Sequence, residues 1–188
     1  MISSKNKDFE REYFELCLKA FPTQIPTSSE LINEYGIYCW DNEQAVELFK
    51  KIVKGKKWVE LDFGVEKIHL QTYLENLFTP EGVVYYLPFY LNLLYKNTYQ
   101  NTFNKDTKFD FNWLIWSLNI QEISKELHDL YLKLTPLQAR CVVLVLTNYL
   151  AYMYPTQEPE LSVMQFWIDL SYSKDEVIEL DLFNLKDC

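Results

Sequence analysis

The sequence predicts an all-α protein: a single compact multi-helix domain of about six to eight helices spanning residues 1–188. Glycine is scarce, with 4 in 188 residues. Apolar residues recur at helical spacing along most of the chain, and two Thr-Pro pairs stand where helices should begin. The length fits one domain that can bury roughly 70% of its extended surface. A short extended hairpin near residues 58–63 or 178–183 is compatible with this class.

The first third of the chain contains two predicted helices. Apolar spacing predicts one over residues 7–21, and Pro22 and Pro26 then enclose a loop. Asp41 is a suitable N-cap for the second helix, and Gly55 is a suitable end. The last turns of this helix and its exit carry five lysines, at Lys50, Lys51, Lys54, Lys56 and Lys57. The helix dipole favours cations there by a few tenths to about 1 kcal/mol each, which explains the run without a ligand.

The middle of the chain contains the most apolar predicted helix. Residues 58–63 predict a short extended piece or turn, and residues 65–78 a helix. Thr79-Pro80-Glu81 then combines a cap, a proline suited to the first helical position and an acid beside the dipole. The helix Thr79–Tyr95 is hydrophobic nearly all round and should be central and buried, with a kink at Pro88. The polar residues 97–110 predict a loop.

A second Thr-Pro helix follows two shorter ones. Apolar spacing predicts helices over residues 111–118 and 120–134. Thr135 and Gln138 form a complete capping box, in which the two side chains satisfy each other's backbone N–H groups. This helix should run to about Tyr154, just before Pro155. We expect the two Thr-Pro helices to be central and to pack against each other.

Composition and charge exclude several classes of protein. Hydrophobic residues make up 48% of the chain and aromatic residues 16%, which excludes disordered, collagen-like and disulfide-miniprotein chains. The formal net charge is −9, which argues against a nucleic-acid binder. Residues 155–188, here called the C-terminal segment, contain eight carboxylates and two lysines. Most of the negative charge is therefore expected at one end of the chain, in an extension packed on the domain.

Several motifs are missing. No two glycines have the spacing of a phosphate-binding loop, and no two cysteines have the spacing of a zinc pair. The N-terminus shows no apolar export signal, and no apolar run reaches the length of a membrane span. We therefore expect a cytoplasmic protein with reduced cysteines, in which Cys17 and Cys141 act as small core residues. We expect no cofactor and no metal.

One block of sequence resembles a known group of proteins. Trp58, the run Phe78–Leu91 (FTPEGVVYYLPFYL) and the later Leu134–Gln138 (LTPLQ) resemble an uncharacterised family of small bacterial proteins. The resemblance covers residues 42–154 and leaves the C-terminal segment outside. It implies a domain type and a bacterial source, and it implies no reaction.

The two histidines are the candidates for chemistry. Glu66 and His69 have the i, i+3 spacing of a carboxylate–histidine metal motif, but His128 lacks the matching glutamate at residue 125. No nucleophile carries a recognisable local signature. We therefore expect that the protein is not an enzyme. A small hydrolase or metal enzyme using His69 or His128 is the alternative, and a structural interaction protein of unknown role is another.

Aromatic and acidic residues together favour a binding protein. Tyrosine and tryptophan are typical interface anchors, and opposite charge raises association rates and selects partners. We expect a basic protein partner, with neither nucleic acid nor membrane. The concrete hypothesis is a bacterial immunity protein that neutralises a basic, nuclease-like toxin by blocking its active site. The predicted partner-binding residues all lie in the C-terminal segment: Glu158, Glu160, Trp167, Asp169, Tyr172, Asp175, Glu176, Glu179 and Asp181.

Overall fold

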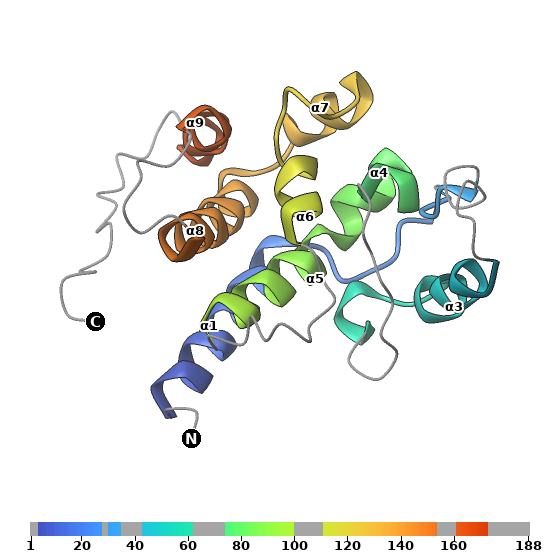
Figure 1. The fold of residues 1–188 in the computed structure, drawn as a ribbon, viewed down its shortest axis with the longest axis horizontal. Helices are drawn as coiled ribbons and strands as arrows, with labels where there is room; N and C mark the ends of the chain where they lie inside the picture. The colour runs from blue at the N-terminus through green and yellow to red at the C-terminus, as the bar shows by residue number, and fades with distance from the viewer. Residues whose placement is uncertain are drawn as a thin grey trace.

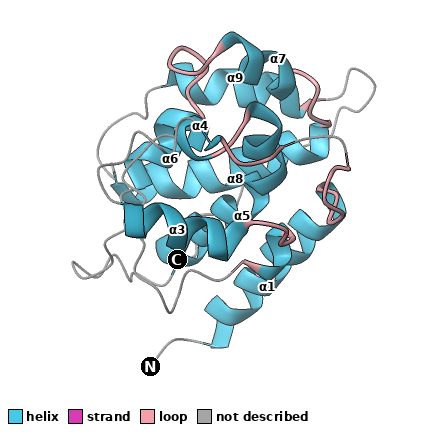
Figure 2. Cartoon of the chain, turned by 90° about the vertical axis from the view of Figure 1, so that its right-hand side faces the viewer, coloured by secondary structure: helices cyan, strands magenta, loops and turns pink. Residues whose placement is uncertain are grey.

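The computed structural model describes residues 4–27, 30–34, 43–61, 74–99, 111–153 and 161–172. These residues form helices, turns and loops and no strand, which confirms the all-α prediction (Figure 2). The eight α-helices among them are α1 (Ser4–Ala20), α3 (Glu43–Val53), α4 (Leu74–Leu77), α5 (Pro80–Tyr99), α6 (Phe111–Ser117), α7 (Lys125–Tyr131), α8 (Pro136–Met153) and α9 (Leu161–Ser171). A 3-10 turn, η1, covers Trp58–Glu60.

The two Thr-Pro helices, α5 and α8, pack against each other at the centre, as predicted. Helix α1 lies against both, α7 packs on α5, and α9 packs along α8. Figure 1 shows α8 and α9 on one side of α5, and α3 and α4 on the other. Every described helix longer than ten residues therefore contacts α5 or α8 directly, and α3 does so through the hydrogen bond from the Tyr86 hydroxyl to the Val53 carbonyl at 3.3 Å. The core forms around this pair.

The start of α5 is joined to a segment distant in sequence. The Thr79 Oγ1 atom accepts a hydrogen bond from the Gly82 N–H at 3.2 Å and donates one to the Glu30 carbonyl at 2.6 Å. The Thr79 N–H donates to the Leu31 carbonyl at 3.1 Å. A Cβ on Gly82 would lie 1.9 Å from that carbonyl oxygen, so the close approach requires glycine. The predicted N-cap of α5 therefore also connects this helix to the segment that contains Glu30 and Leu31.

The start of α8 confirms the predicted capping box. The Gln138 Oε1 atom accepts a hydrogen bond from the Thr135 N–H at 2.8 Å, and the Thr135 Oγ1 atom accepts one from the Gln138 N–H at 3.3 Å. Both side chains reach only local partners in these bonds. The helix then continues to Met153, close to the predicted end.

Two predicted segment boundaries are wrong. The helix expected over residues 120–134 is shorter, because α7 begins only at Lys125. The Asn119 side chain accepts from the Gln121 N–H at 3.2 Å, and the Ser124 hydroxyl caps α7 by accepting from the Leu127 N–H at 3.2 Å. Such short polar side chains compete with helix formation and start helices anew. The loop expected over 97–110 begins too early, since α5 runs to Tyr99.

Other predicted features fall partly outside the described residues. These are the Asp41 cap, most of the helix over 65–78, the rest of the 97–110 loop and the hairpin position at 178–183. Gly55 closes the segment after α3 with a φ of +72°, as expected for a helix end. Residues 58–60 form the η1 turn, where the Trp58 Nε1–H donates to the Pro22 carbonyl at 3.0 Å.

Aromatic rings form a large part of the described core, beside a majority of aliphatic side chains. Phe49, Phe78, Tyr86 and Tyr90 are buried together, with ring centroids 4.8–6.0 Å apart in the pairs that involve Phe78. Buried tyrosines also use their hydroxyl groups. For example, Tyr131 donates to the Ser117 carbonyl at 3.1 Å. The burial of Tyr86 and Tyr90 confirms the expectation that the helix Thr79–Tyr95 is central and buried.

No single described helix is long and apolar enough to cross a membrane. Only α7 and α8 taken together have the length and apolar composition of a membrane span, and their axes are bent by 109° at the break between them.

Candidate functional site

The structure describes three of the nine predicted partner-binding residues, all on or beside α9: Trp167, Asp169 and Tyr172. The other six lie outside the described residues: Glu158, Glu160, Asp175, Glu176, Glu179 and Asp181. These three residues differ clearly in solvent exposure. One lies in the core and two are exposed.

The prediction that Trp167 anchors a partner is wrong. Its side chain is 0% exposed, and its Nε1–H donates to the Leu118 carbonyl at 2.9 Å. Its ring contacts those of Tyr131 and Phe166, with centroid distances of 4.9 and 5.1 Å. The residue lies on the side of α9 that packs into the domain, so no partner can reach it.

Asp169 and Tyr172 do lie at the surface. Asp169 accepts a hydrogen bond from the Gln165 side chain one turn earlier, at 2.7 Å, and the Tyr172 side chain is 46% exposed. The end of α9 between them is held in place, because the Arg140 Nε–H donates to the Ser171 carbonyl at 3.3 Å. The part of the C-terminal segment that follows α9 therefore begins at a point that is attached to α8.

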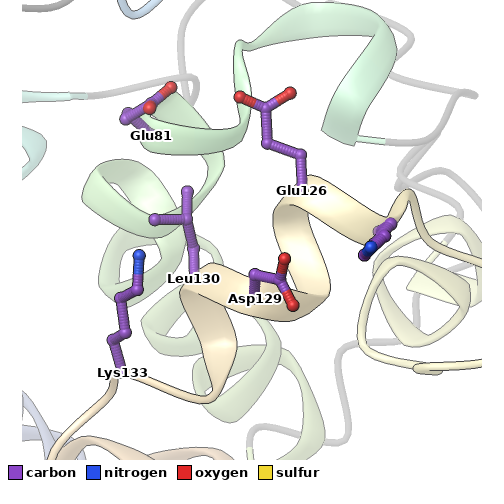
Figure 3. A pocket seen from close by; sticks show the side chains of 6 residues that line it. Glu81, Glu126, Asp129, Leu130 and Lys133 are labelled. Carbon is purple, nitrogen blue, oxygen red and sulfur yellow. The ribbon is translucent and has the colours of Figure 1, made fainter.

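A groove that the sequence did not predict lies between the start of α5 and α7. Its volume is about 430 Å³, and it is lined by Glu81, Lys125, Glu126, Asp129, Leu130 and Lys133. Figure 3 shows the Leu130 side chain between those of Glu81 and Lys133, with Glu126 and Asp129 rising from the same helix. Glu81 is distant in sequence from the other lining residues. Only the packing of α7 on α5 brings them together, and no local motif signals that.

The groove contains three carboxylates and two ammonium groups around one leucine. Its charged lining residues are exposed, so water screens them strongly. Among the described residues, no group of three or more histidine, cysteine or acidic side chains is placed to hold a metal ion. The groove therefore presents both negatively and positively charged side chains at the surface.

His128 lies on another side of α7 from the groove. Its ring contacts that of Phe166 on α9, with centroids 5.7 Å apart, and its Nδ1 atom is 4.0 Å from the Asp129 carboxylate. His69 and Glu66 lie outside the described residues, so the hypothesis of a histidine-dependent enzyme stays a prediction.

The described residues contain nearly equal numbers of acidic and basic side chains, despite the net charge of −9. Part of the lysine run is neutralised locally, since the Lys50 ammonium forms an ion pair with Glu34 at 2.5 Å. Lys51, Lys54 and Lys56 are exposed around the end of α3. The negative excess therefore belongs mainly to residues outside the described ranges, and the C-terminal segment is its largest contributor.

The chain matches no protein-family model, no curated protein and no solved structure. The resemblance to an uncharacterised bacterial family stays a prediction.

Proposed function

We propose that the protein is an acidic binding protein that captures a basic protein partner. In its concrete form it is a cytoplasmic bacterial immunity protein that neutralises a basic, nuclease-like toxin. The observation that carries the proposal is the uneven charge distribution: the described residues have nearly equal numbers of acidic and basic side chains, whereas the C-terminal segment, of which only α9 and Tyr172 are described, contains eight carboxylates and two lysines. Such a distribution gives direction to electrostatic attraction, which a uniformly acidic surface does not.

The mechanism combines steering with steric blockade. Carboxylates of the C-terminal segment would occupy the basic cleft in which a nuclease holds phosphate groups. The attached end of α9 would place Asp169 and Tyr172 at the border of that contact. Tyrosine suits this position because it combines a large apolar ring with a hydrogen-bonding hydroxyl. Trp167 has no part in the contact, because it is buried.

Capture from the native host tests whether the partner has the proposed chemistry. The full chain is immobilised, bound proteins are eluted with salt, and they are identified by mass spectrometry. We expect a basic protein with a nuclease-like domain, encoded beside this gene. Capture of acidic or neutral partners alone would contradict the proposal.

A growth assay then tests the residues. Cells producing the captured toxin are protected by the wild-type chain, and we expect the triple variant D175K/E176K/E179K to lose that protection. The matched control E12K/E15K/E47K makes the same change in net charge at exposed positions of α1 and α3, and it should protect fully. Full protection by the C-terminal variant would count against the proposal.

A further inference from the structure

A polar cluster lies buried where α1, α5 and α8 meet. Cys17 of α1 and Cys141 of α8 are both 0% exposed and neither is in a disulfide. Their thiols interact directly with each other where α1 packs against α8. The two cysteines are far apart in the sequence, so the fold alone brings them together.

The surroundings hold both cysteines in position. The Tyr13 hydroxyl, one helical turn before Cys17, donates to the Cys141 carbonyl at 2.8 Å. The Tyr13 ring is stacked on that of Tyr95 of α5, with centroids 4.1 Å apart and planes inclined by 6°. The Asn92 side chain, also on α5, lies beside the Cys17 thiol and donates to the Pro88 carbonyl at 2.6 Å.

We infer that Cys17 and Cys141 form a peroxide-sensitive pair that closes to a disulfide and ties α1 to α8. Hydrogen peroxide is small and uncharged, so it can reach a buried site during brief openings of the packing. The Cys17 thiolate attacks one peroxide oxygen, giving a sulfenic acid and, after protonation, water. The Cys141 sulfur then attacks the Cys17 sulfur and releases a second water. Two thiols are oxidised, one peroxide is reduced, and two waters form.

The chemistry of the pair assigns these roles. The neighbouring Cys141 thiol lowers the pKa of the Cys17 thiol in spite of its burial. The neighbouring Cys17 thiol, together with burial, raises the pKa of the Cys141 thiol. A thiolate is the form of cysteine that attacks peroxide. The lower pKa favours Cys17 as the attacking sulfur, and the same disulfide and two waters result if Cys141 attacks first. This inference does not depend on the proposed partner.

The test uses the full chain with Cys39→Ser and Cys188→Ser, so that only the pair remains. After peroxide treatment and alkylation we expect an intact mass without alkyl groups and a cross-linked peptide containing Cys17 and Cys141. The Tm should rise by roughly 5–15 °C, because the bond closes a long loop of the unfolded chain. Dithiothreitol should reverse both changes.

The control is Cys17→Ala in the same background, which should show neither the cross-link nor the Tm increase. If the background variant does not fold, peptide mapping of the wild-type chain gives the same answer. Two alkylated thiols after peroxide in folded protein would overturn the inference. Accumulation of sulfinic acid without the cross-linked peptide would overturn it too.

Discussion

The interior of the helical body and the C-terminal segment differ in the side chains that dominate them. The interior is built from aromatic and aliphatic residues, and no charged side chain is buried among the described residues. In the C-terminal segment carboxylates outnumber lysines eight to two. The comparison teaches that stability and, on the proposed function, recognition belong to separate sets of residues. Substitutions should therefore change one property without the other.

Alkaline pH should have the largest effect on the interior. Burial raises the pKa of Tyr86 to about 12 and raises those of Tyr13, Tyr90 and Tyr131 well above the ordinary value of 10. Above pH 10 the unfolded chain releases protons that the folded chain keeps. Stability present below pH 10 is then lost at about 1.4 kcal/mol per pH unit for each tyrosine.

We expect cooperative unfolding between about pH 10 and 12, with helical circular dichroism lost as tyrosinate absorbance appears. Ionisation of every tyrosine near pH 10 in a chain that keeps its helices would break the comparison, because the core tyrosines would then be accessible.

Trp167→Ala should lower the free energy of unfolding by about 3–5 kcal/mol, since it removes a large buried ring. The Leu118 carbonyl also loses its indole donor. Urea unfolding measures the loss. Tyr172→Ala, at an exposed aromatic position, should change stability by less than about 0.5 kcal/mol. If the Trp167→Ala variant were as stable as wild type but unable to bind the partner, Trp167 would have to be an interface residue and not a core residue.

Gly82→Ala should destabilise the protein by about 3 kcal/mol, because the new methyl group would collide with the Leu31 carbonyl. The comparison variant is Gly55→Ala. There a Cβ meets no atom within 4 Å, and only the left-handed backbone conformation is unfavourable, at about 1 kcal/mol. Thermal unfolding of the two variants should rank them in this order. The reverse order would show that the junction at Leu31 is not tightly packed.

The two Thr-Pro helices sharpen the comparison further. Thr79→Ala should cost about 2 kcal/mol, since it removes both the cap of α5 and the bond to the Glu30 carbonyl. Thr135→Ala should cost about 1 kcal/mol, since it removes a local cap. Serine at either position should restore most of the stability. Equal losses in urea unfolding would mean that the tertiary bond of Thr79 contributes nothing.

Local sequence signals predicted most of the helices, but they predicted no helix at α9. Proline at a first helical position, threonine caps and the glutamine of the capping box all act within one turn, so their meaning does not depend on the rest of the fold. The burial of Tyr86 and Tyr90 was also predictable, because their helix is apolar nearly all round. The shortened start of α7 was missed because apolar spacing outweighed the competing signals of Asn119 and Ser124.

Features that join distant segments could not be predicted in this way. The groove depends on how α7 meets Glu81, and the cysteine pair depends on how α1 meets α8. The orientation of α9 could not be predicted from the sequence either, because apolar residues occur on several sides of this helix. Only its packing against the rest of the domain determines that Trp167 faces inward.

The most direct test of the account is the affinity for the captured basic partner, measured at physiological salt by titration calorimetry. Three proteins are compared: wild type, D175K/E176K/E179K, and the charge-matched E12K/E15K/E47K. We predict at least a 100-fold loss of affinity for the C-terminal variant and less than about threefold for the control, because salt screens charges outside the contact. Equal losses in both, or none in the C-terminal variant, would contradict recognition by the C-terminal segment.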